Sequence, residues 1–289
     1  MRRFLSIIMI VALFLACTSC SGGDNKAISY SLSASPSTLD PQYATDTGAH
    51  IIINNAFEGL VRLSADGEVI PGIAESWTVS SDGLTYVFNL KEGTEWYCPS
   101  VLKNEFGEEF YNKFSTEKVT AHDFVFAMQR AVSPNTNSPT AHRLFVIENA
   151  AEIRSGKADV SSLGVTAPQD YVLVIKLTEP CPDMLERLTE SVFMPCNKDF
   201  FEAMNGRYGL SYKHIICNGP FYINMWSKEE SLSIRKNKYY SGGQEVLPSS
   251  VVFSFDYSEK TIADMLSAAT VSAAILPYSS GVFCPICQG

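Results

Sequence analysis

The chain has 289 residues, of which 46% are hydrophobic and 18% charged, and its formal net charge is −9 at pH 7. This composition predicts a globular protein with a sizeable core, in more than one lobe, and excludes a disordered chain. The negative charge argues against nucleic acid as a partner and against a basic membrane-binding face.

The first residues of the chain, 1–20, are typical of a lipoprotein signal peptide. A short basic start precedes residues 4–16, which are almost purely apolar but too short for a normal membrane span. Small residues precede Cys20, and a flexible polar tether follows over residues 21–26. We therefore predict lipidation at Cys20, with Cys17 as the alternative cysteine and an ordinary cleaved signal as the alternative without lipid.

The mature chain begins with a predicted strand over residues 27–32, where apolar and polar side chains alternate. Residues 35–47 are rich in turn formers and are expected to form a loop. Apolar side chains four residues apart predict a helix over residues 49–60.

A hairpin and a capped helix are predicted next. Asp82 and Gly83 lie between two β-rich stretches and favour a tight turn. The alternation over residues 84–90 predicts a strand with one apolar face. Thr120 is placed to cap a helix that Pro134 ends, and Asp123 lies near the positive end of that helix.

The rest of the chain alternates further strands and helices. We predict, in order, an insertion over residues 98–118, a long helix plus loop around 144–164, a strand at 171–177, a helix at 183–190, paired strands at 221–226 and 232–235, a third strand at 251–255 and a short helix at 261–269.

Seven motifs in this order resemble one protein family. They are TLDPQ at 38–42, NNAFEGLV at 54–61, PGIAESW at 71–77, DGLTYVFNL at 82–90, VTAHDFVFAMQR at 119–130, NGPFY at 218–222 and RKNKYY at 235–240. No single motif is specific, and the order carries the resemblance. The family is that of the ABC-transporter substrate-binding proteins for oligopeptides, dipeptides and nickel, solute-binding protein family 5.

The resemblance covers roughly residues 27–277, about the first half of a full-length member. It implies a mixed α/β fold of the type II periplasmic-binding-protein kind, in incomplete form. Residues 27–60 and 191–277 are expected to form a discontinuous lobe I, and residues 61–190 an inserted lobe II. The second ligand lobe is missing, and residues 278–289 depart from the family pattern.

The function that the resemblance implies is binding, outside the cytoplasm, of oligopeptides or dipeptides for an ABC permease and its ATPase. The protein is expected to be a monomer, lipid-anchored to the bacterial membrane. Because the second ligand lobe is missing, the chain alone is expected to bind peptides poorly. A peptide-signal receptor or surface interaction protein on the same scaffold, and a truncated fragment that binds nothing, are the alternatives.

The resemblance also places candidate ligand-binding residues. Thr45, Asp46 and Thr47 lie in the loop that follows the Leu-Asp-Pro motif, and Thr140 matches a position that faces ligand in some members. Extended peptides are held mainly through their backbone, as an added strand is. Asp46 has a second interpretation, as the cap of a helix that begins near Gly48.

Enzyme chemistry finds no support in the sequence. The nucleophile elbow, the zinc-protease motif and the phosphate-binding loop are all missing, and the four histidines lack metal-ligand spacing. We therefore expect neither an enzyme nor a cofactor or metal.

Eight cysteines are present, two of them in the predicted signal. Four widely spaced ones, Cys98, Cys181, Cys196 and Cys217, are predicted to be single buried thiols, although one pair is a candidate disulfide in an exported protein. Cys284 and Cys287 form one CxxC, which is half of a zinc site; a reactive tail or a non-native terminus is the simpler interpretation.

Overall fold

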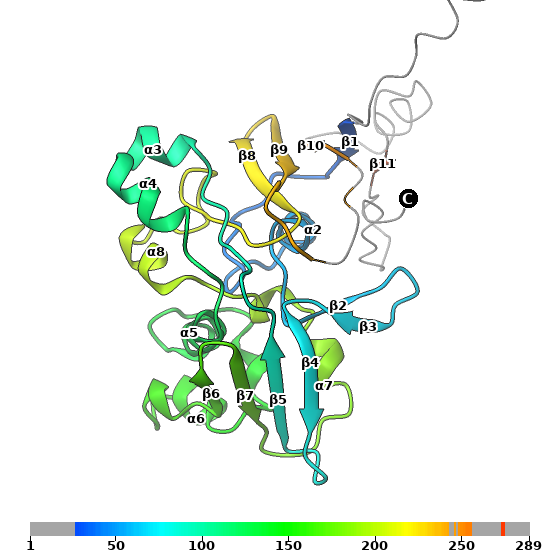
Figure 1. Cartoon of the computed structure of the whole chain (residues 1–289), viewed down its shortest axis with the longest axis vertical. Coiled ribbons are helices and arrows are strands. Elements are labelled where there is room, and N and C mark those ends of the chain that lie inside the picture. The colour runs from blue at the N-terminus through cyan, green and yellow to red at the C-terminus, as the bar shows by residue number, and fades with distance from the viewer. Residues whose placement is uncertain (1–26, 243–245, 247, 256–272, 275–289) are drawn as a thin grey trace, which may run out of the picture.

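The computed structural model describes residues 27–242, 246, 248–255 and 273–274, which contain two main sheets (Figure 1). The predicted signal with Cys20 and Cys17, the tether, the helix at 261–269 and the cysteines Cys284 and Cys287 all lie outside the described residues.

The first sheet has five strands in the order β11-β1-β10-β9-β8. Strand β1 is parallel to its neighbours β10 and β11, and the other pairs are antiparallel. Helix α2 (Thr47–Ala56) packs against this sheet at β8. The strands are β1 (Ala27–Ser31), β8 (Phe221–Ser227), β9 (Ser231–Lys236), β10 (Ser250–Ser254) and β11 (Ala273–Ala274). The predicted strands at 27–32, 221–226, 232–235 and 251–255 are thereby confirmed.

The second sheet is antiparallel, with four strands in the order β4-β5-β7-β6. Helix α5 (Ala121–Val132) lies against β6 and β7, with α6 (Ala150–Arg154) beside it (Figure 1). The strands are β4 (Ala74–Val79), β5 (Thr85–Leu90), β6 (Val165–Gln169) and β7 (Val172–Lys176).

The predicted hairpin and capped helix are both confirmed. Gly83 has a φ of 72° between β4 and β5, the left-handed angle that a tight turn requires. Thr120 and Asp123 form a reciprocal capping box at the start of α5, which ends at Val132, two residues before Pro134. Burial raises the pKa of Asp123 to about 7, against the opposing hydrogen bonds from Thr120 and Trp96.

Shorter elements connect the two sheets. Strands β2 and β3 form a separate two-stranded hairpin, and α3 and α4 occupy the predicted insertion. The bounds are β2 (Val61–Leu63), β3 (Val69–Pro71), α3 (Val101–Phe106), α4 (Glu108–Phe114), η1 (Ala141–Leu144), η2 (Val160–Ser162), α7 (Met184–Arg187), η3 (Ser191–Phe193) and α8 (Lys198–Ala203).

Three predicted helices are shorter than expected. Helix α2 ends at Ala56 rather than residue 60, because Phe57 is extended and the Gly219 amide donates to the Ala56 carbonyl. Within the helix plus loop predicted around 144–164, the α-helix is limited to the five residues of α6, since Asn149 and Gly156 have left-handed φ angles on either side of it. The helix predicted at 183–190 is α7, after which tight turns take over.

The two sheets share one hydrophobic core. An isolated antiparallel bridge joins Tyr97 to Cys217, which lies four residues before the start of β8. The strands of the first sheet come from both ends of the described chain, and those of the second come from its middle. The division into lobes at residues 60 and 190 remains a prediction. Within the described residues, none of the helices has both the length and the apolar character needed to cross a membrane.

The four described cysteines are buried free thiols, so none of them forms a disulfide with another. Burial raises the pKa of Cys196 and of Cys217 to about 12. These side chains are therefore protonated core residues at neutral pH, which confirms the prediction of single buried thiols.

Candidate functional site

The candidate residues Thr45, Asp46 and Thr47 lie where the loop after β1 enters α2. Asp46 is the N-cap: its Oδ1 accepts from the Ala49 amide at 2.7 Å. Its Oδ2 accepts from the Ser37 amide at 3.2 Å and the Ser37 hydroxyl at 2.9 Å. The carboxylate is therefore engaged by the helix and the loop, which is the capping role that the sequence left open.

Thr45 and Thr47 are exposed on either side of the half-buried Asp46. Among the described residues, no hydrogen-bond partner is found for the backbone amides of these three residues. Thr47 is the first residue of α2. The amides in the first turn of a helix point out of its N-terminal end and carry partial positive charge. This short stretch thus offers backbone donors on an exposed surface.

The loop that leads to Thr45 is fixed by a buried ion pair. Arg130, at the end of α5, donates from Nη1 to Asp40 Oδ2 at 2.7 Å and from Nη2 to Asp40 Oδ1 at 2.5 Å. Nη2 also donates to Gln42 Oε1. The guanidinium lies 4.5 Å from the Phe201 ring centroid and 5.4 Å from that of Tyr208. Such a bidentate, stacked geometry is specific to arginine.

Thr140 lies in a second loop, which the structure brings against the first. Ser138 donates from its hydroxyl to the Gln42 carbonyl at 2.6 Å, and the same Oγ accepts from the Thr140 amide at 3.2 Å. Asn137, with a φ of 50°, provides the left-handed turn before it. The loop of Thr140 and the loop of Thr45 to Thr47 are therefore in contact, through a residue that is 2% exposed.

A polar side chain continues this surface along α2. His50, one turn after Thr47, has its Nδ1 2.9 Å from Ser191 Oγ, and that hydroxyl donates to Asn54 Oδ1 at 3.3 Å. With the proton on Nδ1, the ring donates to the Ser191 hydroxyl and leaves Nε2 as an acceptor. Burial lowers the His50 pKa, although the nearby Asp46 and Glu190 oppose the shift. The ring is consequently neutral at pH 7.

The sequence analysis missed Gln42, Arg130, Ser138 and His50 as parts of this site. A signal existed for two of them, because Gln42 belongs to the TLDPQ motif and Arg130 ends the motif of the capped helix. For Ser138 and His50 the sequence holds no comparable signal, since their partners are distant in the chain.

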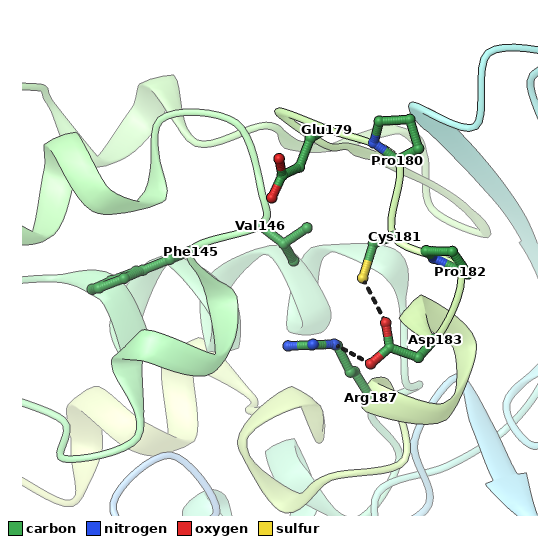
Figure 2. A pocket seen from close by; sticks show the side chains of 8 residues that line it. All are labelled: Phe145, Val146, Glu179, Pro180, Cys181, Pro182, Asp183 and Arg187. Atoms are coloured by element: carbon green, nitrogen blue, oxygen red, sulfur yellow. Dashed lines mark hydrogen bonds and ion pairs between the residues drawn. The ribbon is translucent and has the colours of Figure 1, made fainter.

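A pocket of about 420 Å³ lies elsewhere, on the segment after β7 (Figure 2). Figure 2 shows the Cys181 thiol and the Arg187 guanidinium both turned toward Asp183. The distances are 3.1 Å from Sγ to Oδ1 and 2.8 Å from Nε to Oδ2. The lining residues are Phe145, Val146, Glu179, Pro180, Cys181, Pro182, Asp183 and Arg187.

This pocket does not have the chemistry of an active site. Burial and the Asp183 contact raise the pKa of the Cys181 thiol, which disfavours the nucleophilic thiolate. The charge of Arg187 is already balanced by Asp183. Across the described part of the chain, no group of three or more His, Cys, Asp or Glu side chains is placed to hold a metal ion.

Comparison with known proteins gives one consistent family. Residues 68–281 match the bacterial extracellular solute-binding proteins, family 5, middle region. The chain is 34% identical over 220 residues to the probable deoxycholate-binding periplasmic protein YgiS of Escherichia coli, covering 75% of this chain and 38% of that protein. It is 29% identical over 257 residues to the oligopeptide-binding protein OppA of Bacillus subtilis, covering 83% of this chain and 44% of that protein.

Solved structures agree with the sequence comparison. The substrate-binding domain of an oligopeptide ABC transporter from Bacillus anthracis superposes with a TM-score of 0.76 at 29% identity, covering 86% of this chain and 44% of that one. The expected mixed α/β fold of the periplasmic-binding-protein kind is thereby confirmed. The chain spans less than half the length of these relatives.

Proposed function

The chain belongs to family 5 of the bacterial extracellular solute-binding proteins, and on that premise we propose that it binds oligopeptides or dipeptides outside the cytoplasm. In this proposal it is a binding protein and not an enzyme, and it passes its ligand to an ABC permease and ATPase. A lipid at Cys20, or at Cys17, holds it at the membrane. Fatty-acid labelling that persists after replacement of both cysteines would contradict the anchor.

One observation supports peptides in particular. The amides of Thr45, Asp46 and Thr47 are without partners in the described structure and lie on an exposed stretch next to the loop of Thr140. An extended peptide binds an exposed backbone as an added strand would, with side chains in tolerant pockets. We propose that these residues hold the ligand main chain and that Thr140 contacts it from the second loop.

Hydrogen–deuterium exchange of the purified chain tests the proposal. A mixed pool of dipeptides to hexapeptides, added at millimolar concentration, should protect the amides of residues 45–47. Unchanged exchange at these amides would count against peptide binding here. A pool of free amino acids at the same concentration is the control for non-specific effects.

The variant Thr47→Pro sharpens the experiment. Proline is tolerated at the first position of a helix, where the amide has no partner within the helix, and Asp46 already has the extended φ and ψ of −88° and 147° that a following proline needs. The variant therefore removes one backbone donor while keeping α2. We expect weaker protection by peptides at residues 45 and 46, whereas Thr47→Ala, which keeps the amide, should behave like the wild type.

Bile acids are a second candidate ligand class, because a relative with 34% identity is described as a probable deoxycholate-binding protein. Deoxycholate below its micellar concentration belongs in the same exchange experiment. Protection by deoxycholate without protection by the peptide pool would favour this candidate over peptides.

A further inference from the structure

Ser138 occupies an unusual place between the two candidate ligand loops. It is 2% exposed, and its hydroxyl contacts a backbone 96 residues earlier in the chain, at the Gln42 carbonyl. The same oxygen accepts from the amide of Thr140 and lies 3.2 Å from the Thr140 hydroxyl. One buried hydroxyl thus connects the loop of Thr140 with the loop that leads to Thr45.

The Gln42 end of this connection is held rigidly. Its Nε2 donates to the Val192 carbonyl at 3.2 Å and the Met194 carbonyl at 2.8 Å, and its Oε1 accepts from Arg130. Its backbone amide donates to Asp40 Oδ1 at 3.0 Å. With the side chain and amide of Gln42 fixed, its carbonyl is a stationary point to which Ser138 attaches the second loop.

The next residues toward the ligand stretch are fixed to the same point. The amides of Tyr43 and Ala44 donate to the Asp40 carbonyl at 3.0 Å and 2.9 Å. Ala44 is 1% exposed, and Thr45 immediately after it is exposed. Any change in the position of Gln42 relative to Ser138 therefore reaches Thr45 through a short, hydrogen-bonded turn.

We infer that Ser138 is a positioning residue, whose hydroxyl sets the spacing between the loop of Thr45 to Thr47 and the loop of Thr140. This inference rests on the proposed function in that the spacing matters for a ligand lying against both loops. Ser138 itself is buried and does not contact the ligand. It acts through the Gln42 carbonyl on one side and the Thr140 amide on the other.

Two matched variants isolate the hydroxyl. Ser138→Thr and Ser138→Val add nearly the same volume at this buried position, and only threonine keeps the hydroxyl. Ser138→Ala removes the hydroxyl without added volume. Ser133→Ala is the control for a hydroxyl loss that leaves Gln42 untouched, because this serine lies near the start of the same loop and its hydroxyl accepts from the Asn135 amide.

The experiment compares hydrogen exchange in the ligand-free proteins. In Ser138→Ala and Ser138→Val we expect exchange at the hydrogen-bonded amides of Tyr43, Ala44 and Thr140 to be faster by about tenfold, the factor for one lost hydrogen bond. Exchange in β5 and β7 should stay unchanged, which separates local loosening from global unfolding. Ser138→Thr and Ser133→Ala should keep the wild-type rates at Tyr43, Ala44 and Thr140.

Wild-type exchange at Tyr43, Ala44 and Thr140 in both hydroxyl-free variants, or faster exchange in Ser138→Thr equal to that in Ser138→Val, would overturn the inference. Protection by the peptide pool is read separately. If the wild type shows no protection, the proposed function fails while the ligand-free rates still decide the role of Ser138. If the wild type is protected, we expect protection to need about tenfold more peptide in Ser138→Val than in Ser138→Thr.

Discussion

At the residue scale, the buried pair of Arg130 and Asp40 connects the TLDPQ motif with the end of the capped helix. Asp40 is 8% and Arg130 6% exposed, and neither charge is tolerated alone at such burial. The pair joins a loop beside the first sheet to a helix on the second. The sequence showed both motifs but not this contact, because 90 residues separate the partners.

Replacing Arg130 should therefore be costly. In Arg130→Met the Asp40 carboxylate loses its partner, and we expect a loss of about 3–5 kcal/mol in the free energy of unfolding, measured by urea denaturation. The double variant with Asp40→Asn should recover part of that loss, since no unpaired charge remains. The exposed pair of Arg187 and Asp183 is the control: Arg187→Met should cost at most about 1 kcal/mol. Equal losses in the two arginine variants would contradict the importance of burial.

At the element scale, local signals predicted the strands well and the helix ends poorly. The hairpin turn at Gly83 and the capping box at Thr120 depend on neighbouring residues and were readable from the sequence. The end of α2 depends on the Gly219 amide, which donates to the Ala56 carbonyl. The residues near Ala56 in the sequence do not predict this contact. In the candidate site, the loop of Thr45 was predicted through the family resemblance. Ser138 was not predicted, because its contact with Gln42 joins residues that are distant in the sequence.

Two variants of Asp46 separate its role as the cap of α2 from its proposed role in ligand binding. Asp46→Ala removes the oxygen that accepts from Ala49 and should cost about 1 kcal/mol in thermal or urea denaturation. Asp46→Asn keeps a capping oxygen without the charge, so its stability should stay within a few tenths of a kcal/mol of the wild type. Normal stability combined with lost peptide protection in Asp46→Asn would show that the charge itself serves the ligand.

At the scale of the whole molecule, one core runs beneath both sheets, so the described chain should unfold as a unit. Besides the Arg130 pair, Gln42 bonds to the segment that returns from the second sheet to the first. The two sheets are therefore coupled by buried polar contacts as well as by apolar packing. For the proposed ligand surface, which is made from two loops, this coupling keeps the loops in one arrangement.

A core variant in the second sheet tests this coupling. Leu173, in β7, is fully buried, and Leu173→Ala should cost about 2–5 kcal/mol. Exchange under native conditions should then rise by the same factor in β5 and in β9, which lie in different sheets. Val79→Ala, at a position 44% exposed, is the control with little expected effect. Faster exchange in β5 alone would show that the two sheets open independently.

The position of β1 has a consequence for biosynthesis. This first strand lies between β10 and β11 and is parallel to both, so neither neighbour exists until more than two hundred residues have followed it. The second sheet, by contrast, needs no strand that follows β7 in the chain. The middle of the chain can therefore assemble before its beginning, and β1 stays unpaired until β10 and β11 are present. Until that late pairing, β1 exposes unpaired backbone groups, which makes it a site for aggregation.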